Sequence, residues 1–178
     1  MRIISGRYKK TKLHDFKGRK IRPTTDFLKE VMFSVIFEFN QKQVLDLYAG
    51  TGALGLEAIS RGAENCTFID ISYKAMQLIK KNIAKLNCSN QTKVIKTNAL
   101  RYLNNSQKNY DLIFLDPPYN KNLVNKTLEA IFSNRSYKNN ALIVIEHSKY
   151  EKIENSYREN QIFHKNNGEI NLSILQCK

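Results

Sequence analysis

Four consecutive residues in the middle of the chain, Asp116, Pro117, Pro118 and Tyr119, are of types that could do chemistry together. They follow the apolar run 110–115, and two of the three prolines of the chain stand here side by side. Proline fixes its own φ and restricts the residue before it, so the Asp116 carboxylate and the Pro117 carbonyl should point in fixed directions. Both groups accept hydrogen bonds, and together they could orient an NH2 group, which has two donors, for attack on an electrophilic carbon. Tyr119 would supply a flat face on which a base stacks.

A second group of candidate residues is the glycine-rich stretch LDLYAGTGALG, residues 45–55. Gly50, Gly52 and Gly55 follow a predicted strand and open a predicted helix, where glycine permits a tight turn and the close approach of a ligand. Asp46 stands upstream within the strand, and the glycines lack the lysine of a phosphate-binding loop. The stretch therefore favours a ligand with a charged amino-acid end.

Two further positions would complete a nucleoside site. Asp70 ends the second strand, eighteen residues after Gly52, and a carboxylate there can accept hydrogen bonds from both ribose hydroxyls. Asn98, Ala99 and Leu100 follow the third strand, where an adenine ring could lie. Together these features predict S-adenosylmethionine as the cofactor. The alternative is that the glycines serve packing and that Asp70 caps a helix.

The two groups of residues predict methyl transfer from a sulfonium to an amine nitrogen by in-line displacement. The departing thioether is a good leaving group, so positioning and electrostatic support would supply most of the catalysis. The sequence leaves open whether Asp116 takes the departing proton or only orients the amine. The competing interpretation of residues 116–119 is an ordinary turn with a helix cap.

Strand and helix patterns alternate from residue 43 onward and determine where these residues would lie. The expected strands are 43–48, 65–70, 92–96, 110–116 and 141–147, and the expected helices end near residue 61 or span 72–87, 98–104 and 121–134. A helix is also expected at 24–40, and an antiparallel hairpin at 157–165 and 169–176. Strands separated by helices imply a mostly parallel sheet. Ligands collect at the carboxyl ends of such strands, so both groups of residues should face one crevice.

Composition limits the class of protein. The chain has 178 residues, 42% of them hydrophobic, and no stretch approaches the roughly 18 apolar residues of a membrane span. The three scattered cysteines, odd in number, favour a reducing and therefore cytoplasmic location. His14, His147 and His164 are dispersed, so we expect no metal site.

Positive charge is concentrated at the start of the chain. Residues 1–22 hold nine cations and one acid, which gives +8 of the formal net charge of +13. Such a cluster favours a polyanionic partner, because phosphate neutralisation is the main source of non-specific nucleic-acid affinity; a solvated tail is the alternative. We expect an N-terminal arm, residues 1–22, that forms a small basic β-hairpin, followed by one catalytic domain at 23–178.

Beyond single motifs, five segments of this chain resemble one known family. They are RIISGRYKKTKL, IRPTTDFLKEVMFSVI, VLDLYAGTGALGLEAISRGA, FLDPPY and VIEH. DPPY alone looks like a motif shared by DNA adenine-N6, RNA guanine-N2 and glutamine methyltransferases. The whole pattern resembles the bacterial 16S rRNA guanine-N2 methyltransferase family of the RsmD type, over nearly the full chain. The resemblance implies a class I, Rossmann-like fold for S-adenosylmethionine, with a seven-stranded, mostly parallel sheet and a C-terminal antiparallel hairpin.

The resemblance also implies roles for individual residues. The cofactor would be bound by Asp46, Tyr48, Ala49, Gly50, Thr51, Gly52, Asp70, Ile71, Asn98, Ala99 and Leu100. The target guanine would be held by Asp116, Pro117, Pro118 and Tyr119. Contacts to 16S rRNA, in an assembled small ribosomal subunit, would come from Arg2, Arg7, Lys9, Lys10, Lys12, Arg19, Lys20 and Arg22. We expect a monomer.

Three positions depart from the family pattern. Asn98 stands where an aspartate is usual, so its contact with the adenine amine would use an amide oxygen. Phe27 replaces a common arginine, and Asp70 is the single carboxylate at its strand end.

Two alternatives to the rRNA enzyme remain. DNA adenine-N6 methyltransferases usually carry a target-recognition domain, for which 178 residues leave no room. A catalytically inactive RNA-binding assembly factor would have no reason to retain DPPY in register.

Overall fold

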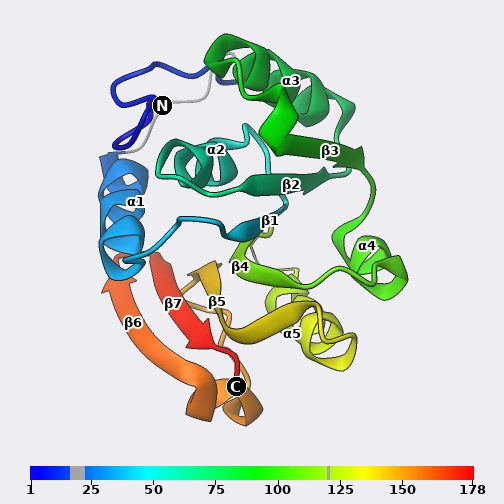
Figure 1. Ribbon diagram of the computed structural model, residues 1–178. Coiled ribbons are helices and arrows are strands. Elements are labelled where there is room, and N and C mark those ends of the chain that lie inside the picture. The colour runs from blue at the N-terminus through cyan, green and yellow to red at the C-terminus, as the bar shows by residue number, and fades with distance from the viewer. Residues whose placement is uncertain (17–22, 120) are drawn as a thin grey trace.

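The computed structural model describes residues 1–16, 23–119 and 121–178, and it contains one seven-stranded sheet with helices on both faces (Figure 1). Its strands are β1 (Gln43–Leu47), β2 (Asn65–Asp70), β3 (Thr92–Lys96), β4 (Tyr110–Leu115), β5 (Tyr137–Ser148), β6 (Gln161–Asn167) and β7 (Ile170–Gln176). They lie in the order β3-β2-β1-β4-β5-β7-β6. Strands β1 to β5 are parallel, and β7 runs antiparallel between β5 and β6. The predicted sheet and its C-terminal hairpin are confirmed.

The helices are α1 (Pro23–Val35), α2 (Ala53–Ser60), α3 (Tyr73–Leu86), α4 (Ala99–Asn105) and α5 (Leu123–Ser133), with short 3₁₀ segments η1 (Ser89–Gln91) and η2 (Asn155–Asn160). The first three helices cover one face of the sheet, and α4 and α5 cover the other (Figure 1). Successive strand residues point to opposite faces, so Val44 joins the core beneath α2 while Leu45 joins the core beneath α5. In the described ranges, no helix has the length and apolar character needed to cross a bilayer.

The first helix is shorter than its sequence pattern suggests. It ends at Val35, not near Asn40. Ile36 and Phe39 are nevertheless buried, because the segment after the helix also packs into the core before Gln41 turns the chain with φ of 58°. The helical spacing of apolar residues therefore extends beyond the helix itself, which is why the sequence pattern overestimates its length.

Two strand boundaries also differ from the prediction. β5 begins at Tyr137, four residues before 141, because Tyr137 pairs with Tyr110 ahead of a register shift. β6 begins at Gln161 and not at 157, because residues 155–160 form η2.

The described part of the N-terminal arm, residues 1–16, is an antiparallel hairpin packed against the body of the protein. Arg2 pairs with Lys12, and the Ile3 amide donates to the Thr11 carbonyl at 3.0 Å. Ile3 and Leu13 are buried in the same core as α1 and α2. The domain boundary at residue 22 stays a prediction.

A buried carboxylate on α2 attaches the arm. Glu57 is fully buried and accepts the Ile4 and Ser5 amides at 2.8 and 2.9 Å. It also pairs with Lys29 at 3.2 Å and with Arg61 at 2.9 Å. A buried charge is tolerated only when it is paired and hydrogen-bonded. The docked arm therefore supplies amides that stabilise the buried Glu57 carboxylate, and the carboxylate in turn holds the arm in place.

The approach of the arm to α2 requires a glycine. Gly6 has φ of 81°, and a Cβ built there would lie 1.9 Å from the Ser60 carbonyl oxygen. Any larger residue would push the arm away from the end of α2.

Candidate active site

The two predicted groups of site residues meet at the carboxyl edge of the sheet. β1 and β4 are adjacent and parallel, and Leu47 lies opposite Leu115. The glycine loop and the Asp116 turn therefore leave neighbouring strands at the same level. Strand order reverses direction between β1 and β4, which is where α/β sheets form a ligand crevice.

The glycine loop is built from left-handed backbone. Tyr48, Gly50 and Gly52 have φ of 60°, 55° and 76°. Gly52 is the N-cap of α2 and donates its amide to the Ala49 carbonyl at 2.7 Å. Left-handed φ suits glycine but is unfavourable for tyrosine, and the Tyr48 hydroxyl is anchored to Thr127 at 2.9 Å. The loop thus presents backbone, with few side chains, to a ligand.

Asp70 connects the end of β2 to this loop. Its Oδ2 accepts the Gly50 amide at 2.9 Å and its Oδ1 accepts the Ser72 amide at 2.7 Å. Each carboxylate oxygen can accept a further hydrogen bond, so Asp70 retains capacity for two ribose hydroxyls. Ile71, beside it, is 67% exposed and offers an apolar surface.

Asp46 lies under the start of α2, 2% exposed, where its Oδ2 accepts the Gly55 amide at 3.0 Å. Burial raises the pKa of Asp46 to about 8; the Gly55 hydrogen bond lowers that pKa and the nearby Asp70 charge raises it. Gly55 itself serves packing, since a Cβ there would lie 2.4 Å from the Phe68 ring. Direct contact of Asp46 with the cofactor stays a prediction.

The third predicted part of the cofactor site follows the next strand, β3, at the start of α4. Asp70 pairs with Lys96 across β2 and β3, which brings residues 98–100 to the same edge. Asn98 is exposed, Ala99 is buried and Leu100 is half-buried. The Asn98 Oδ1 accepts the Arg101 amide at 3.2 Å and so caps α4. The oxygen expected to meet adenine therefore also has a helix partner.

Glu146 is a partner of the Asp116 turn that sequence analysis did not identify. Pro117 is buried and Pro118 is exposed. The Tyr119 hydroxyl donates to Glu146 Oε1 on β5 at 2.7 Å, which fixes the ring beside Asp116. The segment VIEH contained this residue, but nothing in its local pattern identified a partner across the sheet.

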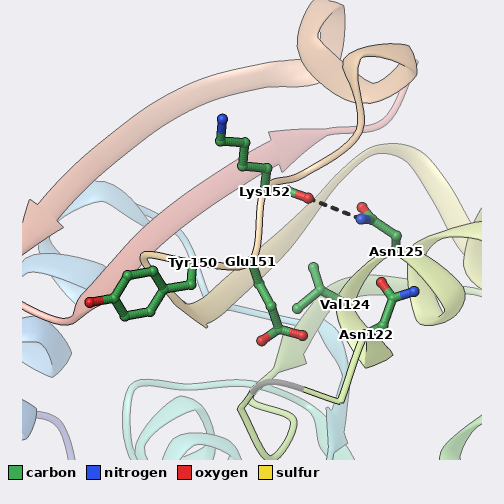
Figure 2. Close-up of a pocket in the computed structure, with 6 residues that line it drawn as sticks. All are labelled: Asn122, Val124, Asn125, Tyr150, Glu151 and Lys152. Carbon is green, nitrogen blue, oxygen red and sulfur yellow. Dashed lines mark hydrogen bonds between the residues drawn. The ribbon is translucent and has the colours of Figure 1, made fainter.

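A pocket of about 310 Å³ lies next to this turn, between the start of α5 and the segment after β5 (Figure 2). Its lining is Asn122, Val124, Asn125, Tyr150, Glu151 and Lys152. The Asn125 side chain bridges the two walls, donating to the Lys152 carbonyl at 2.9 Å and accepting the Glu154 amide at 3.1 Å. Both walls follow the carboxyl ends of β4 and β5, so the pocket extends the crevice edge.

The cations of the arm are placed on its outside. Arg2, Arg7, Lys9, Lys10 and Lys12 are exposed, whereas Arg19, Lys20 and Arg22 lie outside the described residues. Arg7 donates to the Tyr8 hydroxyl at 2.6 Å and to Gln91 Oε1 at 2.9 Å, which holds its guanidinium at the surface. In the described part of the chain, no group of three metal-ligating side chains occurs.

Known proteins resemble this chain in both sequence and fold. A family model described as conserved hypothetical protein 95 matches residues 1–176. The chain is 40% identical to ribosomal RNA small subunit methyltransferase D of Buchnera aphidicola subsp. Baizongia pistaciae (strain Bp) over 148 residues, 82% of this chain and 75% of that one. It is 35% identical to the Escherichia coli (strain K12) protein of the same name over 147 residues, which cover 82% of this chain and 74% of that one. The solved structure of yhhF from Escherichia coli matches with a TM-score of 0.88 at 30% identity, and the match covers 100% of this chain and 98% of that one.

Proposed function

This chain belongs to the family described as conserved hypothetical protein 95, and we propose that it transfers a methyl group from S-adenosylmethionine to the exocyclic N2 of a guanine in 16S rRNA. It is a methyltransferase of the class I fold, and S-adenosylmethionine is its cofactor. The names of its relatives specify small-subunit ribosomal RNA. The residues of the Asp116 turn favour an NH2 group as the acceptor, and the choice of guanine N2 rests on the resemblance of the whole sequence pattern to the RsmD type.

One observation carries the proposal: the glycine loop and the Asp116 turn leave adjacent strands at one level, with Leu47 opposite Leu115. A methyl donor held by the first and an amine held by the second would be neighbours. Had the two segments opened onto different sides of the sheet, the same residues could not share a reaction.

The residues present fit the cofactor. The Asp70 carboxylate would accept the ribose hydroxyls, and the left-handed backbone at Gly50 and Gly52 would admit the methionine end without side-chain obstruction. When bound, S-adenosylmethionine supplies a methyl group on a sulfonium and leaves as the thioether.

The Asp116 turn would orient the nucleophile. The Asp116 carboxylate and the Pro117 carbonyl would accept the two N–H bonds of the guanine amine, which turns its lone pair towards the methyl carbon. Methylation of the nitrogen would release one proton, which Asp116 or water would accept. Tyr119, held by Glu146, would support the base by stacking.

The base must leave its helical stack to reach this crevice, so the RNA is expected to present a flipped guanine. Exposed cations of the arm would neutralise phosphates around it. We further propose that the protein acts as a monomer in the cytoplasm, on an assembled small ribosomal subunit.

The test is methyl transfer from labelled S-adenosylmethionine into small ribosomal subunits of a strain that lacks the enzyme, followed by mass-spectrometric mapping of the RNA. The proposal expects one methyl group on N2 of one guanine. Label in DNA but not in rRNA would indicate an adenine-N6 enzyme, and binding without transfer would indicate an inactive assembly factor.

A further inference from the structure

A buried carboxamide links the N-terminal arm to the glycine loop proposed to bind the cofactor. Asn82 lies on α3 and is fully buried. Its Oδ1 accepts the His14 amide at 2.7 Å, and its Nδ2 donates to the His14 carbonyl at 3.1 Å and to the Thr51 carbonyl at 3.0 Å. One side chain therefore holds the returning strand of the arm and the glycine loop at once.

Other contacts close the same junction. The Thr51 hydroxyl donates to the Met1 sulfur at 3.5 Å, and Thr51 is only 5% exposed. Ile3 and Leu13 of the arm share a core with Ala53, the first residue of α2. The arm thus packs directly against the glycine loop at Thr51.

Undocking the arm would disturb that loop. A buried amide that loses its partners is strongly unfavourable, and Asn82 has two of its three hydrogen bonds with His14. Without the arm, the Asn82 side chain would turn towards water and release the Thr51 carbonyl. The loop would then sample conformations other than the one that admits a ligand.

We propose that Asn82 couples docking of the N-terminal arm to binding of the cofactor, as a positioning residue for the glycine loop. The inference rests on the proposed function in one respect, namely that the Thr51 segment holds the methionine end of S-adenosylmethionine. Coupling between two sites is reciprocal, so the cofactor stabilises the docked arm as much as the docked arm favours the cofactor. The arm, with its proposed RNA-binding cations, would then be most firmly docked when the methyl donor is bound.

The experiment uses the full chain and S-adenosylhomocysteine, without RNA. In the wild type, saturating S-adenosylhomocysteine should slow hydrogen exchange of the His14 and Leu13 amides. In Asn82→Ala, calorimetry should give about tenfold weaker binding, and the slowing of arm exchange should disappear. In transfer assays, KM for the cofactor should rise while kcat at saturation stays close to that of the wild type.

The matched control is Lys85→Ala, on the same helix. Lys85 Nζ donates to the Lys12 carbonyl at 2.6 Å and so contacts the arm without reaching the glycine loop. Its affinity should stay within twofold of the wild type. Three results would each overturn the coupling. Affinity for S-adenosylhomocysteine could fall equally in both variants, or stay unchanged in Asn82→Ala. Hydrogen exchange of the arm amides in the wild type could also be the same with and without the ligand. This hydrogen-exchange measurement uses only the wild type, so it can refute the coupling even if Asn82→Ala fails to fold. Failure of the wild type to bind S-adenosylhomocysteine would instead contradict the cofactor site itself.

Discussion

Gly50 and Asp70 are joined by a hydrogen bond of 2.9 Å from the Gly50 amide to the Asp70 carboxylate, although twenty residues separate them. The residue proposed for the ribose therefore also shapes the loop proposed for the methionine end. In Asp70→Asn, an amide NH2 would face the Gly50 or the Ser72 amide, because only one acceptor oxygen remains. We expect at least tenfold weaker binding of S-adenosylhomocysteine, measured by calorimetry. Affinity equal to that of the wild type would remove Asp70 from the site.

Asp116→Ala should abolish methyl transfer, because the amine would lose the acceptor that orients it. Binding of S-adenosylhomocysteine should change little, since the residues proposed to bind the cofactor lie at the carboxyl ends of β1, β2 and β3. The measurement pairs single-turnover transfer with calorimetry on the same preparation. Turnover near that of the wild type would refute the role given to Asp116.

Tyr119→Phe keeps the ring but removes its hydrogen bond to Glu146. The ring should then stack less consistently against the target, so we expect about a tenfold lower transfer rate, in line with the removal of one charge-assisted hydrogen bond. Glu146→Gln retains an acceptor and should lose less. If Tyr119→Phe is indistinguishable from the wild type, the hydroxyl contact has no part in positioning the base.

Deleting the arm is a poor test of its charge, because Ile3 and Leu13 belong to the core. Lys9→Gln and Lys10→Gln change charge at exposed positions and leave those core residues in place. Each should reduce the salt dependence of binding to small ribosomal subunits, lowering the log–log slope by about 0.7–0.9 for every phosphate that the variant no longer neutralises. Lys108→Gln, exposed between α4 and β4, is the control and should leave the slope unchanged. Unchanged slopes in all three variants would mean that these arm cations do not contact RNA.

Asp46 should make the folded state less stable as pH rises. Its pKa moves from 3.8 to about 8 in the folded protein, chiefly through burial. Between these values the folded chain retains a proton that the unfolded chain has lost, so the free energy of unfolding falls by at most about 1.4 kcal/mol per pH unit. Asp46→Asn keeps an oxygen for the Gly55 amide and removes this ionisation. Urea unfolding should therefore favour the variant increasingly from pH 5 to pH 8.

The control for that experiment is Asp111→Asn. Burial alone would raise the pKa of Asp111, but hydrogen bonds from Lys138 and the Gln43 amide lower it. Asp111 is then ionised in both states above pH 5, and its stabilising effect disappears only at lower pH. The difference between this variant and the wild type should stay constant from pH 5 to pH 8. A constant difference for Asp46→Asn as well would contradict the assignment.

Sequence periodicity predicted the sheet because alternation of strands and helices depends on local pattern and burial. The boundaries it missed are those where apolar residues are buried outside regular structure, as at Ile36 and Phe39. The glycine loop and the Asp116 turn could be located from the sequence, because glycine, aspartate and proline mark the points where strands end. Glu57, Asn82 and Glu146 were not, because each resembles an ordinary polar residue of a helix or strand. Their importance comes from partners 25 or more positions away, which only the folded chain brings together.

The arm is attached largely through its main chain. Glu57 accepts the amides of Ile4 and Ser5, and Lys85 and Lys29 donate to the carbonyls of Lys12 and Arg2. Such attachment is indifferent to which side chains those arm residues carry, apart from the space that Gly6 must leave. The outward-facing residues of the arm can therefore change during evolution. Such changes could adapt the protein to a different RNA surface while the contacts that attach the arm to the helices stay the same.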